Sequence, residues 1–352
     1  MKNKILVCYN DPVSLYDNYL GKELSSNEEF TDLSEKGFSQ QIDFIKNELE
    51  KNFSEVYTLG FNRDILSIIN SIKNINPDVI VNFVESIDGD AEYESHVTGL
   101  YELLGIRYTG NYGFCLANCL SKTRTKQILS SHKISTPKFL TLAVNEKLEE
   151  SKLNMSFPLI VKLAREDASI GISELSVVKD SAELKRQINF LRKNYKQSVI
   201  IEEYIEGREI NVSILGDKVL PLSEIRFDGL PENYPKIITY EAKWSPNSIY
   251  YKNTVPKCPA DVSDKLRIKI EQIAYEAFNA LGCRDYARVD IRLSNKNVPY
   301  VIEVNPNPDI SVDSGFVRSA SYAGLNYSDL LKTLVEFALN RKAYDTTFAV
   351  EG

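Results

Sequence analysis

Two short segments near the carboxyl end alternate apolar and polar residues, and they constrain this chain more than any other feature. They read Arg-Val-Asp-Ile-Arg at 288–292 and Val-Ile-Glu-Val-Asn-Pro at 301–306. Alternation of this kind is typical of strands that pack one face on a core. Side chains at even offsets share a face of a strand. We therefore expect Arg288, Asp290 and Arg292 together on one strand, and Glu303 with Asn305 on the next.

A hairpin connection at residues 294–299 would bring the two strands side by side. The oxygen atoms of Asp290, Glu303 and Asn305 would then converge beside a guanidinium. Oxygen ligands of this kind suit Mg²⁺ that is bound partly through nucleotide phosphates. Taken alone, the pattern favours a hairpin with a merely solvated polar face, so the metal site depends on the rest of the chain.

Length and composition describe an ordinary globular protein. The chain has 352 residues, of which 43% are hydrophobic and 26% are charged. This length corresponds to roughly two or three domains, and the composition disfavours disorder. A net charge of −7 argues against partners such as nucleic acid and anionic membranes. No apolar run approaches the ~18 residues of a membrane span, and no signal-peptide pattern opens the chain.

Cysteine usage indicates a reducing compartment. The chain has five cysteines, and only Cys115 and Cys119 lie close together in the sequence. An odd count without metal-ligand spacing points to reduced thiols in a cytoplasmic protein. We expect most of them to be small packing residues.

The first third of the chain alternates predicted strands and helices. Apolar strands are expected at 4–9, 56–59 and 79–84, and an amphipathic helix at 90–104 is stopped by Gly105. This order predicts a parallel sheet with ligands at its carboxyl edge. No G-x-G-x-x-G motif opens a helix, so a dinucleotide fingerprint is absent.

A lone lysine, Lys162, interrupts the apolar strand predicted for 157–163. An uncompensated charge is costly there. A bound phosphate would explain it, and so would an edge strand from which the lysine reaches solvent. The loop at 166–171 could offer backbone amides and the Ser169 hydroxyl to phosphate oxygens, although a single glycine is also common in plain turns.

The stretch at 199–209 runs from an apolar strand into carboxylates. Glu202, or the backbone after it, could accept the amino group of adenine, and Glu209 could bind the ribose hydroxyls. An acidic turn between two strands is the alternative. The long segment at 226–257, rich in Pro, Asn and Tyr, is expected to be a loop with short structured pieces, as in active-site lids.

The order of these features resembles the ATP-grasp superfamily, and more narrowly the D-alanine–D-alanine ligases and their homologues. The resemblance covers about residues 77–345 and includes Tyr-Thr-Gly at 108–110 and Tyr-Glu-Ala-Lys at 240–243. The ordered set is specific, whereas no single motif is.

The resemblance implies a mixed α/β (α+β) ATP-grasp fold. It would have an N-terminal Rossmann-like parallel-sheet domain (1–115), a small central subdomain (116–205) and a C-terminal subdomain with the metal site (206–352). It also implies a homodimer.

The resemblance assigns roles to individual residues. Those implied to bind ATP are Lys122, Lys162, Ser169, Glu202, Glu203, Tyr204, Ile205, Glu209 and Lys243. Asp290, Glu303 and Asn305 would hold two Mg²⁺ ions, for which Mn²⁺ could substitute. The catalytic residues would be Arg288, Lys243 and Ser169. Arg288 would stabilise an acyl phosphate and a tetrahedral intermediate, and Lys243 would close over the phosphates.

The implied reaction joins a small-molecule carboxylate to an amine through an acyl phosphate, with release of ADP and phosphate. Amino acids or similar metabolites are the expected substrates. Three alternatives stay open: a D-alanine–D-alanine ligase proper, a ligase that transfers the acyl group to a thiol or carrier-bound group, and a non-catalytic ATP-binding regulator.

The residues expected to bind the carboxylate and amine substrates differ from the family pattern. A His-Gly-Gly-type loop is replaced by Cys-Tyr-Asn-Asp-Pro at 8–12, where Asp11 or Glu85 could compensate. Asp309 stands where the family has a glycine, and the serine pair of the phosphate loop is reduced to Ala-Ser at 168–169. Arg318 could read a substrate carboxylate or be a surface arginine. These differences favour the same fold with different substrates.

Overall fold

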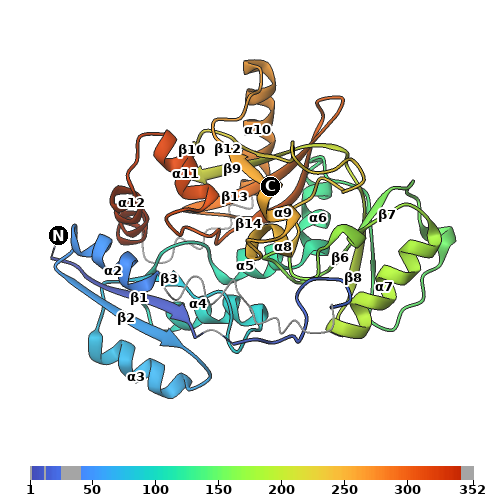
Figure 1. The fold of residues 1–352 in the computed structure, drawn as a ribbon. Coiled ribbons are helices and arrows are strands. Elements are labelled where there is room, and N and C mark those ends of the chain that lie inside the picture. The colour runs from blue at the N-terminus through green and yellow to red at the C-terminus, as the bar shows by residue number, and fades with distance from the viewer. Residues whose placement is uncertain (1, 12, 25–40, 342–352) are drawn as a thin grey trace.

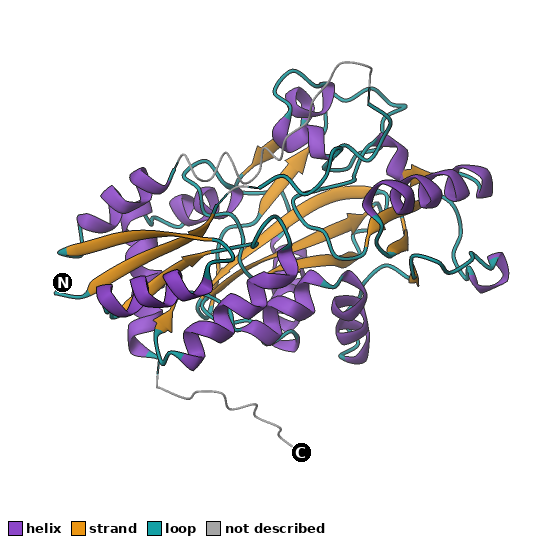
Figure 2. Cartoon of the chain, turned by 90° about the horizontal axis from the view of Figure 1, so that it is seen from below, coloured by secondary structure: helices purple, strands orange, loops and turns teal. Residues whose placement is uncertain are grey.

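Three sheets follow one another along the chain in the computed structural model (Figure 1). The structure describes residues 2–11, 13–24 and 41–341. Figure 2 shows the strands running through the middle of the molecule with helices on their outer sides. Within the described residues, no helix combines the length and the apolar character needed to cross a membrane.

The first sheet is parallel, as the alternation of strands and helices predicts, and its strand order is β2-β1-β3-β4. The strands are β1 (Lys4–Asn10), β2 (Glu55–Phe61), β3 (Val79–Phe83) and β4 (Arg107–Tyr108). The accompanying helices are α2 (Ile42–Glu50), α3 (Ile65–Ile75), the 3₁₀ turn η1 (Ala91–Tyr93) and α4 (Glu94–Leu103). Every residue of β3 is buried, because two separate apolar cores lie on the two faces of this sheet.

The second sheet is antiparallel with the order β5-β8-β6-β7. Its strands are β5 (Phe139–Leu142), β6 (Leu159–Leu163), β7 (Val177–Val178) and β8 (Val199–Glu203). Its helical elements are α7 (Ser181–Tyr195), η2 (Glu150–Lys152) and η3 (Glu174–Ser176). The strand that carries Lys162 lies between β8 and β7, and the Lys162 side chain is only 12% exposed and pairs with Glu202. The explanation that this lysine reaches solvent from an edge strand is therefore wrong.

The third sheet has the order β12-β11-β9-β13-β14, and β10 pairs with β9. Its strands are β9 (Gly207–Leu215), β10 (Lys218–Val219), β11 (Ser223–Arg226), β12 (Val255–Lys257), β13 (Tyr286–Ser294) and β14 (Pro299–Asn305). The helices that precede or interrupt it are α5 (Gly113–Leu120), α8 (Tyr240–Trp244), α9 (Ile249–Asn253) and α10 (Asp264–Ala280). Residues of α5 and α10 cover its apolar face. Helix α6 (Lys122–Ser131) precedes the second sheet in the chain but packs against β14 and α10 of the third.

The expected hairpin is confirmed. β13 and β14 pair antiparallel, with Asp290 opposite Glu303 and Arg288 opposite Asn305. A bulge after Asp290 shifts the register, so that Ile291 faces Val301. Such a bulge adds a residue to one strand and bends it locally. Both polar pairs are therefore kept on one face of the sheet.

The chain ends by returning to the first sheet. Helices α11 (Gly315–Tyr322) and α12 (Tyr327–Asn340) share a core with β1 and α2, in which Leu334 contacts the same apolar cluster as Ile5 and Val7 (Figure 1). Just after α12, Arg341 pairs with Asp285 at 2.5 Å. The last helix is thus part of the packing that holds the first and third sheets together.

This packing predicts a large penalty for Leu334→Ala. Leu334 is 1% exposed in the core between α12 and the first sheet. Removing a buried leucine side chain costs about 2–5 kcal/mol, and we expect that loss in the free energy of unfolding measured with urea. Leu103→Ala is the matched control, because Leu103 is 88% exposed. Equal effects of the two substitutions would contradict the placement of α12.

Candidate active site

The polar face of the third sheet is built by the register of β9, β13 and β14. Arg292 lies opposite Glu209, and Asp290 lies opposite Asn211. The intervening residues of both strands, such as Val289 and Val212, are fully buried in the core on the opposite face. The alternation read in the sequence therefore separates a charged face from an apolar one.

Asp290 is the most heavily hydrogen-bonded carboxylate of this face. Arg288 forks onto it, with Nε donating to Oδ1 and Nη2 to Oδ2, each at 2.8 Å. The side-chain amide of Asn211 donates to Oδ1 at 2.7 Å, and that of Asn305 donates to Oδ2 at 3.0 Å. Burial still raises the pKa of Asp290 above its usual value, against the attraction of Arg288.

Glu303 faces the cationic side chains of the site. Burial alone would raise its pKa, but the charges of four cations outweigh this and hold the pKa well below the usual value. These cations are Lys122, Lys162, Lys243 and Arg288. These charges therefore favour the ionised form of Glu303. Asp290, Glu303 and Asn305 together offer the hard oxygen donors that Mg²⁺ prefers, so this donor set fits the implied metal.

Glu202 is buried at the end of β8, between two lysines. Its Oε2 accepts from Lys162 at 3.3 Å and is paired with Lys126 at 3.2 Å. These charges lower the pKa of Glu202, against the effect of burial. Its second oxygen, Oε1, is buried and has no hydrogen-bond partner among the described residues. A buried acceptor without a donor is costly, and an amino group such as that of adenine would satisfy it.

Arg292 organises the neighbouring part of the site. Its guanidinium donates to the carbonyls of Ile205, Gly207 and Lys236 at 3.0–3.1 Å and to Glu209 at 3.2 Å. It also lies 5.7 Å from the centre of the Tyr204 ring. The sequence places Arg292 on the polar face without a role. In the structure it joins the segment between β8 and β9 to the long loop after β11.

The loop after β6 is shaped by two non-glycine residues with positive φ, Ala168 at +46° and Ser169 at +63°, and by Gly171 at +74°. The carbonyl of Glu166 in this loop accepts a hydrogen bond from the Lys122 ammonium. Helix α8 is attached to the loop, because Trp244 Nε1 donates to the Ala168 carbonyl at 3.3 Å. The predicted lid is thus packed on the predicted phosphate loop.

Lys243 lies on this lid and faces the carboxylates of the third sheet. Burial lowers its pKa, and the charge of Arg288 acts in the same direction. The negative charges of Glu303, Asp290 and Asp167 act on it in the opposite sense. The lid therefore brings a cation to the candidate metal site from a segment outside the sheet.

A segment after β1, residues 13–24, crosses to the second sheet, and we call it the strap. Tyr16 donates to Glu166 of the phosphate loop at 2.6 Å. Tyr19 stacks on Tyr240 of α8 with ring centres 5.6 Å apart, and Lys22 pairs with Glu241 at 2.6 Å. The strap therefore contacts both the loop and the lid. Its sequence carries no periodic pattern, and it was not predicted.

The pocket beside Glu303 is strongly acidic. It is lined by Glu85, Glu94, Leu116, Cys119, Leu120, Lys122, Thr125, Glu166, Asp167 and residues 302–307. We call it the acidic pocket. Burial raises the pKa of Glu94 to about 8, although a hydrogen bond from Asn307 at 3.0 Å acts in the opposite direction. Burial also raises the pKa of Glu166 to about 7. The negative charge of the pocket therefore grows as the pH rises through these values, which favours a cationic ligand at higher pH.

The side chains of some residues expected at the site point elsewhere, although the backbone of Glu203 stays next to Glu202. The Glu203 side chain points away from Glu202, because neighbours on a strand alternate, and pairs with Lys138 at 3.7 Å. Arg318 lines a second groove with Arg226 and Lys257, outside the acidic pocket. Asp11 accepts from Asn62 at 3.2 Å, beside β2.

Asp309 is exposed and accepts from the backbone amide of Ser311 at 2.8 Å. Its charge acts on Arg288, whereas Glu85 lines the acidic pocket directly. Of these two predicted substrate residues, only Glu85 is therefore in the pocket wall.

Three residues of the site were not singled out from the sequence. Lys126 lies one helical turn after Lys122, a spacing that could have indicated a second lysine on the same face of α6. Asn211 follows Glu209 at an even offset, which could have placed it on the polar face. Glu94 shows no local signal, because its role depends on the packing of α4 against the loop after β14.

Comparison with known proteins identifies the family. A family described as D-ala D-ala ligase C-terminus matches residues 128–336. "Uncharacterized protein y4sG" of Sinorhizobium fredii is 33% identical over 75% of each chain. The D-alanine–D-alanine ligase of Nitrosospira multiformis is 32% identical over 69% of this chain and 74% of its own length.

A solved structure shares the fold over nearly the whole chain. It is the D-alanine–D-alanine ligase of Bacillus anthracis complexed with ATP, which is 25% identical and superposes with a TM-score of 0.73 over 96% of this chain and 97% of its own. The expected mixed α/β ATP-grasp architecture is therefore confirmed. The chain belongs to the D-alanine–D-alanine ligase family of the ATP-grasp fold.

Proposed function

We propose that this protein is an ATP-dependent carboxylate–amine ligase that forms an amide bond through an acyl phosphate. One observation carries the proposal. The oxygen donors of Asp290, Glu303 and Asn305 lie on one face of the third sheet. The positive charges of Lys122, Lys162 and Lys243, which belong to three other segments, act on Glu303. A regulator that only senses ATP has no need of this combination of metal donors and cations.

Each group of residues in the site would have a separate role in the reaction. Lys122, Lys162 and Lys243 would bind phosphate oxygens, and Asp290, Glu303 and Asn305 would hold Mg²⁺, which supplies charge neutralisation to the transferred phosphoryl group. Arg288 would stabilise the oxyanion that forms when the amine attacks the acyl carbon. The lid, held to the phosphate loop by Trp244, would exclude water from the acyl phosphate.

The nucleotide would lie between the second and third sheets. The unpartnered Oε1 of Glu202 would accept the amino group of adenine. Glu209 is paired with Arg292, and it would bind a ribose hydroxyl while keeping that ion pair. Tyr204 and Ile205 lie between these two carboxylates and would line the base.

The substrates define two versions of the proposal. The relatives named D-alanine–D-alanine ligase favour D-alanine for both positions. The carboxylates of the acidic pocket, once they are ionised, favour an amine substrate that carries additional positive charge. The homodimer and the cytoplasmic location implied by the resemblance belong to the same proposal.

Phosphate release tests the reaction. Mg-ATP should be incubated with D- and L-amino acids, including basic ones, singly and in pairs, and phosphate should be measured. We expect release that requires one carboxylate and one free amine. Release with D-alanine alone would identify the first version. Tight ATP binding without release from any pair, or release that requires a thiol acceptor, would contradict the proposal.

Glu303→Gln should reduce this release by about 100-fold or more, because a lost charge at a metal site affects both metal binding and transition-state charge. Glu336→Gln on α12 is the matched control, since Glu336 only pairs with Lys332 on the surface. Circular dichroism would verify that both variants are folded. Unchanged turnover in Glu303→Gln would refute the metal assignment.

Lys162→Ala should weaken ATP binding by about 10- to 100-fold, which corresponds to the loss of a hydrogen bond to a charged group. Isothermal titration with a non-hydrolysable ATP analogue would measure the change. Lys185→Ala is the control, because Lys185 is 56% exposed on α7 and pairs with Glu150. An unaltered affinity in Lys162→Ala would exclude its phosphate role.

The acidic pocket predicts a pH dependence. Glu94, with its pKa raised by burial to about 8, is neutral below that pH and charged above it. The KM for a cationic amine substrate should therefore fall as the pH rises through about 8, by roughly 10-fold for one added ion pair. The ratio of KM values between the wild type and Glu94→Gln cancels the ionisation of the substrate. A ratio that does not vary with pH would contradict this role.

A further inference from the structure

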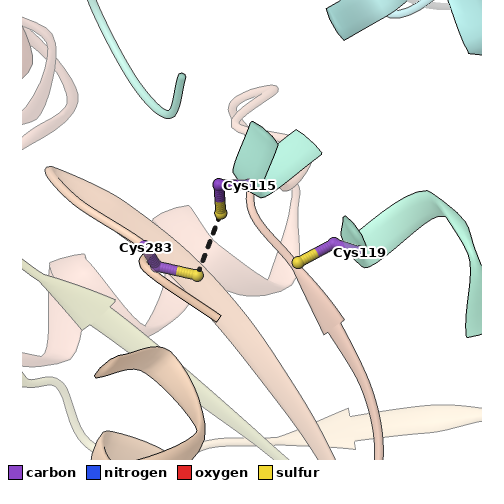
Figure 3. A group of neighbouring side chains, drawn as sticks. All are labelled: Cys115, Cys119 and Cys283. Carbon is purple, nitrogen blue, oxygen red and sulfur yellow. Dashed lines mark hydrogen bonds between the residues drawn. The ribbon is translucent and has the colours of Figure 1, made fainter. Parts of the chain in front are cut away.

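Three of the five cysteines gather in one place, although they come from distant parts of the chain. Cys115 and Cys119 lie one helical turn apart on α5, and Cys283 lies in the turn between α10 and β13. Their sulfur atoms all lie within 4.8 Å of one another (Figure 3). We call these residues the thiol cluster. All three cysteines are reduced in the structure.

The sulfur positions match a shared ligand better than a covalent bond. Cys115 Sγ lies 3.5 Å from Cys283 Sγ, whereas a disulfide requires ~2.05 Å. Sulfurs bound at ~2.3 Å to one tetrahedral metal ion lie about 3.8 Å apart. The Cys115–Cys283 separation is about 0.3 Å below this value, and the limit of 4.8 Å on all three separations places Cys119 Sγ within reach of the same ion.

The surroundings supply a compensating charge. Arg284 follows Cys283 directly, and its positive charge acts on Cys115. Its Nε donates to the Gly110 carbonyl at 2.9 Å, but its buried Nη2 has no hydrogen-bond partner among the described residues. Three thiolates and one divalent ion carry a net charge of −1, which a guanidinium would neutralise. A buried donor without an acceptor is costly, and an N–H···S contact to a thiolate would relieve it.

Core packing by itself is the alternative explanation for the positions of these cysteines. Cys115 and Cys119 are buried in the core beneath the third sheet, and Cys283 packs against its edge. A small apolar residue would fill any one of these positions. The Arg284 guanidinium is also held by the rings of Tyr108 and Tyr112, 5.1 and 5.6 Å from their centres. The Cys115 thiol donates a weak hydrogen bond to Cys283 Sγ. Three sulfurs from two segments therefore meet beside a fixed cation, which is the arrangement that a bound thiolate–metal centre needs.

We propose that Cys115, Cys119 and Cys283 form a binding site for a thiophilic divalent cation of the zinc class. The ion would pin α5 to the turn before β13. Binding would exchange three thiol protons, released to solvent, for three metal–sulfur bonds, without any change in oxidation state. Cys119 also lines the acidic pocket, so the site forms part of its wall. Three protein ligands leave a fourth position for water.

The thiol cluster differs chemically from the candidate Mg²⁺ site. Thiolates select soft or borderline ions, whereas carboxylate and amide oxygens select Mg²⁺. The proposal therefore does not depend on the ligase reaction, and each can fail without the other.

Zn²⁺ uptake tests the proposal. The full-length protein should be reduced, stripped with a chelator and titrated with Zn²⁺ against a chromophoric competitor, in excess Mg²⁺ so that the oxygen site is filled. We expect one equivalent of Zn²⁺ with release of about three protons at low pH, where the thiols are protonated. Cys115→Ser and Cys283→Ser should each weaken binding by about 100-fold. Cys258→Ser is the matched control, because Cys258 is a buried cysteine outside the cluster.

Co²⁺ provides a readout that needs no variant. Bound to the wild-type protein, it should show sulfur-to-metal charge-transfer absorption with an intensity typical of three thiolates, and Zn²⁺ should abolish it. Absence of this absorption, or Zn²⁺ uptake that is unchanged in both Cys115→Ser and Cys283→Ser, would overturn the proposal. Formation of a Cys115–Cys283 disulfide with no metal uptake by the reduced protein would overturn it as well.

Discussion

The carboxylate of Asp290 is buried on the polar face of the third sheet, where an unpaired charge would cost roughly several kcal/mol. The hydrogen bonds that stabilise this charge come from three strands. Arg288 donates from the same strand, Asn211 from β9 and Asn305 from β14. A slip of one residue between these strands would turn the charges toward the core and the valines toward solvent. The register that buries the core is therefore the same register that assembles the candidate metal ligands.

The remaining charges of the site come from outside this sheet. Lys122 begins α6, Lys162 lies within β6 and Lys243 is on α8, and all three act on Glu303. The strap joins these parts, since Tyr16 bonds the phosphate loop and Tyr19 stacks on the lid. The segment that follows the first sheet thus crosses the molecule and contacts both the phosphate loop and the lid. Any opening of the lid must break or carry these contacts.

Much of the fold was predictable where the signal is local. The hairpin of β13 and β14 follows from an alternation with period two, and the bulge left both polar pairs on the predicted face. Glu202 and Lys162 were each placed on a strand, but only the pairing of β6 with β8 shows that they contact each other. Glu203 was grouped with its neighbours by sequence order, although consecutive strand residues face opposite ways.

Local periodicity and the ordered motifs determined, from the sequence alone, most of the longer strands and helices, the faces of β13 and β14 and the resemblance to the family. The short elements, such as α5, β5 and α8, were not predicted. The tertiary structure alone decided which distant segments meet: Lys126 beside Glu202, the strap on the lid, Glu94 beside Asn307, and Cys283 beside Cys115. It also placed Arg318 in a different groove. The physical reason is that backbone geometry sets which residues share a face within an element. Contacts between elements instead depend on how separate apolar faces pack, and no local spacing encodes that packing.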